Sequence, residues 1–135
     1  MIRSAAFAIS LAPLVLAGCT YGMNHDSDAR RQVADVPQAK VTGKPQSCVP
    51  LSDLRDSRIR DDRTIDFIRA GKKGWRVSLD SACPGLKSEN KFTYETSLSQ
   101  LCSTDIIYVL HDYGGSLQRG AGCGLSQFVP IELVK

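Results

Sequence analysis

His111 is the residue best suited to acid–base chemistry, because histidine titrates near neutral pH and serves as the general base in many enzymes. Asp112 follows it directly and Asp105 lies six positions earlier, so either carboxylate could orient the imidazole. No recognised motif places a serine or cysteine nucleophile beside it. We expect His111 to end a strand before a turn at Gly114-Gly115. A small enzyme that uses His111 with Asp105 or Asp112 is the alternative.

The glycine-rich run Gly120-Ala-Gly-Cys-Gly124 is a second candidate, because glycine loops can hold phosphate groups. A P-loop requires lysine after its last glycine, and Leu125 stands there instead. A dinucleotide fingerprint requires a preceding strand, a following helix and a different glycine spacing. We therefore expect a glycine turn that lets Cys123 reach a disulfide partner, and we predict no cofactor.

Charged residues are concentrated between positions 53 and 76. The aspartates do not have the spacing of a calcium loop, and arginines lie between them, so we expect a solvated, salt-bridged strand surface and no metal site. Lys72 and Lys73 are expected at a hairpin tip, where they could contact anionic headgroups or acidic envelope polymers. The charged residues are Asp53, Arg55, Asp56, Arg58, Arg60, Asp61, Asp62, Arg63, Asp66, Arg69, Lys72, Lys73 and Arg76.

Three aromatic residues could line a pocket for a small ligand. Trp75, Tyr94 and Tyr108 each fall within a segment of β pattern. Ligand pockets are usually lined by aromatic and apolar side chains with a few polar groups. A small-ligand-binding module is therefore a further alternative to be compared with the structure.

The first 18 residues have the features of an export signal. Arg3 precedes the uncharged, mostly apolar run Ser4–Leu16, which is shorter than the roughly 20 apolar residues of a membrane-spanning helix. The run ends in Leu16-Ala17-Gly18-Cys19, which resembles the lipobox of bacterial lipoproteins at all four positions. The resemblance implies cleavage after Gly18 and a lipid on Cys19 that anchors the chain to a membrane. Thr20, where inner-membrane lipoproteins have aspartate, implies the outer membrane of a two-membrane cell.

The other four cysteines form an even set once Cys19 carries lipid. Export to an oxidising compartment favours two disulfides among Cys48, Cys83, Cys102 and Cys123, for which three connectivities exist. The ends of small barrels often meet, so we expect Cys48 to pair with Cys123, which leaves Cys83 for Cys102.

Composition divides the mature chain into a tether and one small domain. Residues 20–47 contain few large apolar side chains, so we expect residues 19–47 to form a lipidated, flexible tether. The domain is expected at residues 48–135. Without Arg3, 16 of the 17 basic side chains remain against 14 acidic ones, a balance that gives no indication of a nucleic-acid partner.

The pattern inside the domain is mainly β. Alternation in Arg63–Arg69 and Trp75–Leu79, with glycines between them, predicts a hairpin with Ile65, Phe67, Trp75, Val77 and Leu79 facing inward. Further strands are expected near 58–60, 92–96, 106–110 and 127–131. We expect 106–110 to be the most buried strand and Pro130 to lie on an edge strand. A short helix is expected near 97–102. Five or six short strands of this kind predict a disulfide-stapled sandwich or partly open barrel.

The domain also resembles a family of small exported bacterial proteins that is defined only as a domain of unknown function. The matching segments are Cys48–Leu51, Asp61–Ile65, Cys83–Leu86, Leu101–Ser103, Gly120–Leu125 and Phe128–Pro130. The resemblance implies an exported, cysteine-bearing domain and carries over no activity or catalytic residue. The sequence thus predicts a lipid-anchored envelope protein, most simply a non-enzymatic interaction or structural module. Its expected partners are the membrane and an envelope protein or anionic envelope polymer.

Replacement of the lipid acceptor tests the anchor. We expect Cys19→Ala to abolish lipid attachment and signal processing, because the thiol is the group that is acylated. Metabolic labelling with a palmitate analogue measures this. Equal labelling of the wild-type and Cys19→Ala chains would contradict the lipobox interpretation.

Overall fold

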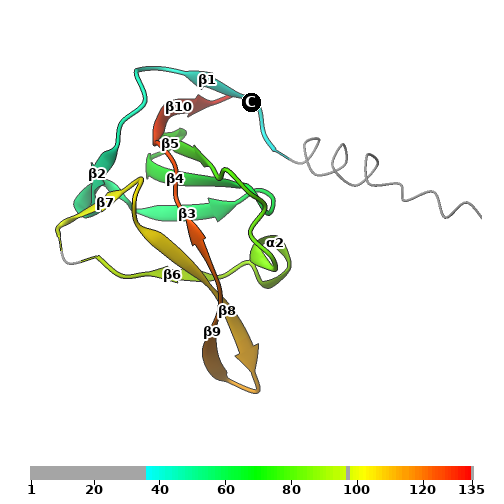
Figure 1. The fold of residues 1–135 in the computed structure, drawn as a ribbon. Coiled ribbons are helices and arrows are strands. Elements are labelled where there is room, and N and C mark those ends of the chain that lie inside the picture. Colours follow the sequence, from blue (N-terminus) through cyan, green and yellow to red (C-terminus); the bar gives the residue numbers. More distant parts are fainter. Residues whose placement is uncertain (1–35, 97, 135) are drawn as a thin grey trace, which may run out of the picture.

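The computed structural model describes residues 36–96 and 98–134, so the signal segment, Cys19, Thr20 and most of the expected tether lie outside the described residues. The described chain is mainly β, with several small sheets that do not close into a barrel (Figure 1). None of the helices in the described part is long and apolar enough to cross a membrane.

The strands in residues 36–96 and 98–134 form three antiparallel sheets. The largest has the order β1-β10-β5-β4-β3, a second has the order β6-β8-β9, and β2 pairs with β7. The elements are β1 (Ala39–Val41), β2 (Cys48–Pro50), η1 (Leu51–Asp53), β3 (Asp56–Ile59), β4 (Thr64–Ala70), β5 (Lys73–Ser78), α2 (Leu86–Glu89), β6 (Phe92–Tyr94), β7 (Gln100–Cys102), β8 (Ile106–Tyr113), β9 (Ser116–Gly124) and β10 (Val129–Leu133).

The core lies where the inner faces of the sheets meet. Phe67 of β4 is its centre, with its ring 5.7 Å from that of Phe128 and 6.1 Å from that of Phe92. Ile107 and Val109 of β8 are fully buried against the same cluster. The three-stranded sheet therefore covers the larger sheet through apolar side chains, as in other packed β layers.

The expected hairpin is confirmed. β4 and β5 are joined at Gly71 and Lys72, and Gly71 has a φ of 57°, a conformation that glycine adopts without strain. Trp75 pairs with Phe67, and Trp75, Val77 and Leu79 are buried as the alternation predicted.

The folded part begins before the expected boundary at Cys48. β1 lies within the stretch expected to be a tether, and it pairs with β10 along Ala39–Val41. Gln46 forms a further bridge to Phe128. Because β1 occupies the edge, β10 lies inside the sheet, and the prediction that Pro130 marks an edge strand is wrong.

Both disulfides are present, but the expected pairing is wrong. Cys48 is bonded to Cys102, directly opposite it in the β2–β7 ladder, and Cys83 is bonded to Cys123. The two ends of the described chain do meet, as expected, because β1 pairs with β10. β1 precedes Cys48 and β10 follows Cys123, so the meeting of the ends does not bring these two cysteines together. Each bond restricts the unfolded chain and contributes about 2–4 kcal/mol.

Several segments differ from their expected structure. Residues 100–102, expected to be helical, form β7, and the described chain instead has a short α2 at residues 86–89. β8 is less buried than β4, because Ile106 and Tyr113 of β8 are exposed whereas the first five residues of β4 are buried. The glycine-rich run is part of the nine-residue strand β9. The described chain has ten strands, more than the five or six expected.

Truncation of Trp75 tests the core. Its side chain is 7% exposed, so we expect Trp75→Ala to lower the free energy of unfolding by about 3–5 kcal/mol. Tyr113→Ala is the control, because Tyr113 is 62% exposed and its loss should change stability by less than about 0.5 kcal/mol. Denaturant titration measures both. Equal effects of the two truncations would contradict the arrangement of the core.

Candidate functional site

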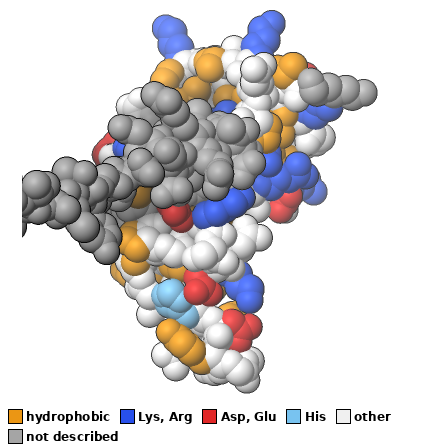
Figure 2. Space-filling view, turned by 90° about the vertical axis from the view of Figure 1, so that its right-hand side faces the viewer, with side chains coloured by type: hydrophobic (Ala, Val, Ile, Leu, Met, Phe, Trp, Pro, Cys, Tyr) orange, Lys and Arg blue, Asp and Glu red, His pale blue; other side chains and the backbone are white. Residues whose placement is uncertain are grey.

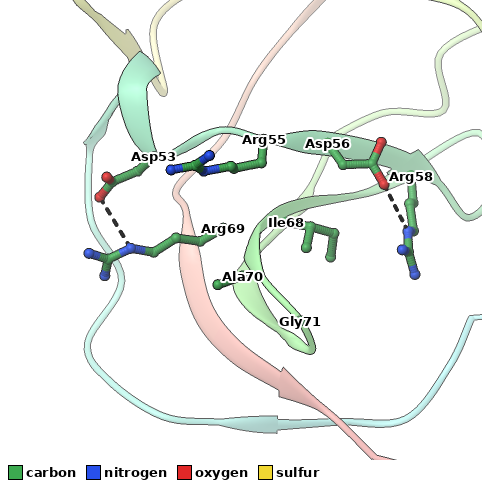
Figure 3. A pocket seen from close by; sticks show the side chains of 8 residues that line it. All are labelled: Asp53, Arg55, Asp56, Arg58, Ile68, Arg69, Ala70 and Gly71. Carbon is green, nitrogen blue, oxygen red and sulfur yellow. Dashed lines mark hydrogen bonds and ion pairs between the residues drawn. The ribbon is translucent and has the colours of Figure 1, made fainter.

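An open hollow of about 650 Å³ lies beside β3 and the end of β4 (Figure 3). Its lining combines three arginines with two aspartates and a small apolar floor. The lining residues are Asp53, Arg55, Asp56, Arg58, Ile68, Arg69, Ala70 and Gly71. Guanidinium groups bind carboxylates and phosphates through paired hydrogen bonds, so a hollow with three of them has the chemistry of an anion site.

Backbone pairing positions the arginines. The amide N–H of Arg55 donates to the carbonyl oxygen of Ile68 at 2.9 Å, which holds the start of β3 against β4. The register of the two strands shifts between Ile68 and Ala70, just before the turn at Gly71. Arg55, just before β3, and Arg69 of β4 consequently project into one region of the surface, as Figure 3 shows.

The ion pairs of the hollow are exposed and therefore weak. Arg69 lies 3.5 Å from Asp53, and Arg58 lies 3.1 Å from Asp56. Both arginine side chains are about half exposed, and exposed pairs of this kind contribute little in water. No ion pair joins Arg55 to another residue of the described ranges. The hollow thus has a net positive charge, and an incoming anion could compete for its arginines.

The expected hairpin-tip lysines lie at the same end of the sheet. Gly71 lines the hollow, and Lys72 and Lys73 follow it as exposed residues. The carbonyl oxygen of Lys72 accepts a hydrogen bond from the N–H of Leu133, and Val134 donates to the carbonyl oxygen of Gln38. Gln38, near the start of the described chain, and Lys72 thus lie on opposite sides of the end of β10. The two residues are about two strand spacings apart, at about 4.8 Å each. We call Lys72 and Lys73 the lysine turn.

A second charged cluster is buried and structural. The carboxylate of Asp66 is fully buried, and it accepts hydrogen bonds from Arg60 at 2.8 Å and from Arg76 at 2.7 and 2.9 Å. Nη2 of Arg76, which donates to Asp66 at 2.9 Å, also donates to the carbonyl oxygen of Pro37 at 3.0 Å. The prediction of a wholly solvated charged surface is thus wrong for Asp66, because β4 is covered on both faces. It is also wrong for Asp61, which is buried and accepts a hydrogen bond from the N–H of Arg63.

The histidine has a different partner from those expected. Nδ1 of His111 lies 3.0 Å from a carboxylate oxygen of Glu89 in α2. Asp105 accepts a hydrogen bond from the N–H of Cys102 at 2.7 Å, and Asp112 accepts one from the N–H of Gly115 at 2.8 Å. The contact with Gly115, and then Lys91, holds the pKa of Asp112 below its usual range. Neither expected dyad with His111 is formed.

The expected aromatic pocket is not formed. Trp75 is in the core, and Tyr94 pairs with Ile107 on the core-facing side of the three-stranded sheet. Tyr108 is one residue further along β8 and therefore points to the opposite face. There the guanidinium of Arg119 lies 5.3 Å from its ring centroid.

The glycines of β9 accommodate side chains of β8 rather than a phosphate. A Cβ at Gly120 would lie 2.2 Å from Nε2 of His111, and a Cβ at Gly122 would lie 3.1 Å from the ring of Tyr108. Each glycine leaves space for a ring from the neighbouring strand. In the ranges 36–96 and 98–134, no group of three or more His, Cys, Asp or Glu residues is arranged to hold a metal ion.

The sequence predicts the basic stretch but not the hollow. The signal for the hollow was the position of Asp53 and Arg55 just before a strand that pairs with the strand containing Arg69. Comparisons of the chain with protein-family models, with curated proteins and with solved structures found no match.

Removal of the buried carboxylate tests the structural role of Asp66. We expect Asp66→Ala to cost about 3 kcal/mol of unfolding free energy, because two arginines lose their shared partner. Asp56→Ala removes an exposed carboxylate and is the matched control, with an expected change below about 0.5 kcal/mol. Thermal or denaturant unfolding measures both. An Asp66→Ala chain as stable as the control would show that the triad is not structural.

Proposed function

We propose that the chain is a lipid-anchored protein of the cell envelope whose β domain binds an anionic envelope polymer without catalysis. The lipobox-like Leu16-Ala17-Gly18-Cys19 supports the anchor, and Thr20 supports the outer membrane as its location. The hollow lined by Arg55, Arg58 and Arg69 carries the binding proposal.

The arrangement of charge favours a polymer over a single small anion. The hollow is open, and the exposed Lys72 and Lys73 extend its positive charge past the hairpin turn. In Figure 2 most of the Lys and Arg side chains in view lie on the upper part of the domain, away from the projecting β8–β9 hairpin. A chain with repeated phosphate or carboxylate groups can contact the hollow and the turn at the same time.

The position of the anchor supports a partner near the membrane. Val36, the first described residue, is 17 positions after Cys19, and a chain of that length spans at most about 60 Å. It leads to the end of the sheet that also carries Lys72. The basic end of the domain is thereby kept within reach of headgroups and polymers at the membrane surface.

The contacts of the charged groups favour binding over catalysis. His111 is paired with Glu89, and Asp112 caps the hairpin turn. All four described cysteines are in disulfides, so none offers a thiolate nucleophile. By contrast, the arginines of the hollow are exposed and available to a ligand.

Loss of hollow arginines tests the proposal. We expect the Arg55→Ala, Arg69→Ala double variant to bind long-chain polyphosphate at least ~10-fold more weakly, because each charged contact to an anion contributes about 1.5–3 kcal/mol. The slope of log K against log salt should also become shallower, since fewer counterions are released. Fluorescence anisotropy with the mature, lipidated protein in nonionic detergent measures both quantities.

A matched control separates the hollow from overall charge. Lys87→Ala, Lys44→Ala removes the same two positive charges at exposed positions outside the hollow, and it should leave affinity within about twofold. A polyglutamate probe tests whether carboxylates replace phosphates. Equal weakening by the two double variants, or no binding of either polyanion to the wild-type chain, would contradict the proposal.

A further inference from the structure

The β8–β9 hairpin projects from the body of the domain and has a long free edge (Figure 1). β9 is the outer strand of the three-stranded sheet and has nine residues. The other strands at sheet edges in the described part have three or four residues. A free strand edge presents unpaired N–H and C=O groups that can pair with another strand.

Between Ser116 and Arg119 the β9 edge lacks the features that usually protect an edge from pairing, because the register shift between β8 and β9 lies beyond Arg119, at Gly120 and Ala121. β1 is protected by its shortness and Lys40, and β3 by charged side chains, with the N–H of Ser57 occupied by the carboxylate of Asp56 at 2.8 Å. From Ser116 to Ala121, β9 contains no proline and one charged residue, Arg119. Between Ser116 and Arg119, the edge therefore has no proline or bulge that would exclude a further strand.

The charge of Arg119 is directed away from the free edge. Its guanidinium lies over the ring of Tyr108 in the neighbouring strand and forms an ion pair with Glu95, beyond β6. This contact holds the pKa of Glu95 below its usual range, so the pair is ionised at neutral pH. The charge of Arg119 is thus neutralised by Glu95 of the same domain. The β9 strand of a second copy could therefore approach without repulsion between the two Arg119 side chains.

The hydrogen-bond alternation shows which backbone groups are free. The turn has two residues, Gly114 and Gly115, both with positive φ, so the flanking pair Tyr113 and Ser116 is hydrogen-bonded. Hydrogen-bonded and non-hydrogen-bonded pairs alternate from there along the β8–β9 ladder. The pair of Leu110 and Arg119 is therefore non-hydrogen-bonded. Consistently, the N–H of Leu110 points away from β9 and donates to the carbonyl oxygen of Lys91 at 3.1 Å.

It follows that the N–H and C=O groups of Leu117 and Arg119 point away from β8. Leu117 and Arg119 therefore each offer one free N–H and one free C=O on the same edge, on either side of Gln118. In an antiparallel copy of the strand, Arg119 lies opposite Leu117, so the two residues can exchange both hydrogen bonds. With Gln118 on the two-fold axis, Leu117 of each copy pairs with Arg119 of the other, so the two arginines are not opposite each other.

We propose that the β9 edge, from Ser116 to Gly120, is a self-association surface at which a second copy of this chain adds its own β9 in antiparallel register centred on Gln118. The result is a continuous six-stranded sheet shared by two copies. The far end of β9 does not take part, because the loop at residues 80–84 lies beside residues 122–124 across a hollow of about 330 Å³. This pairing is independent of the anion-binding proposal.

Position-specific crosslinking tests the register. In the full-length mature protein under mild oxidation, Gln118→Cys should form a disulfide-linked dimer, because the two Cα atoms across the axis would lie about 4.5 Å apart. Ser116→Cys, equally exposed in the same strand, should give at least ~10-fold less dimer, because in this register residue 116 faces residue 120 of the other copy. Equal crosslinking at both positions, or none at Gln118→Cys, would overturn the proposal.

A backbone variant tests whether the edge itself makes the contact. Leu117→Pro in the Gln118→Cys chain removes an N–H that β8 does not use, and it should abolish the dimer, whereas Leu117→Ala should retain it. Circular dichroism checks folding. If the Leu117→Pro chain is unfolded, the difference in disulfide-linked dimer between Gln118→Cys and Ser116→Cys tests the proposal by itself. A folded Leu117→Pro chain that still dimerises would overturn the proposal. So would a mixed disulfide with another protein in place of the dimer, since the occupant would then be a different partner.

Discussion

The buried carboxylate of Asp66 links β4 to both strands that pair with it and, through Arg76, to the start of the described chain. It binds Arg60 at the end of β3 and Arg76 in β5, and Arg76 also binds the carbonyl oxygen of Pro37 where the described chain begins. Because the carboxylate has no access to water, its two arginines have to stay in place to compensate the charge. The triad therefore fixes the register of β3, β4 and β5 on the outer face of the large sheet. The arginine hollow and the lysine turn are positioned by those same strands.

The opposite face depends on apolar contacts and on the two disulfides. Phe67 brings the large sheet against Phe92 and Phe128, and Cys83–Cys123 links the loop after β5 to β9. Cys48–Cys102 links β2 to β7 beside the same core. These constraints leave two regions exposed at opposite ends of the domain in Figures 1 and 2, the basic end near the start of the described chain and the β8–β9 hairpin. One end has charge suited to a polyanion, and the other has a free strand edge suited to a second copy.

The sequence was sufficient to predict the β class, the β4–β5 hairpin and the oxidation of four cysteines, because alternation and cysteine count are local signals. It was insufficient where partners are distant. Ala39–Val41 has no strong β pattern of its own, and only its pairing with β10 makes it a strand. Asp66 alternates like a solvent-facing residue, and only the folded chain brings Arg76 and Arg60 to it. The glycines at 120 and 122 resemble a turn until the rings of His111 and Tyr108 are seen to require the space. Disulfide pairing failed for the same reason, since it depended on which ends meet.

We propose binding of a polyanion at the hollow lined by Arg55, Arg58 and Arg69. The most direct measurement is an NMR titration of the isotope-labelled mature protein with polyphosphate, observing backbone amides and the arginine Nε–H groups. We expect the resonances of Arg55, Arg69 and the 71–73 turn to shift, and the amide resonances of β9 to stay unchanged. Shifts confined to lysines outside the hollow, or distributed evenly over all basic residues, would contradict it.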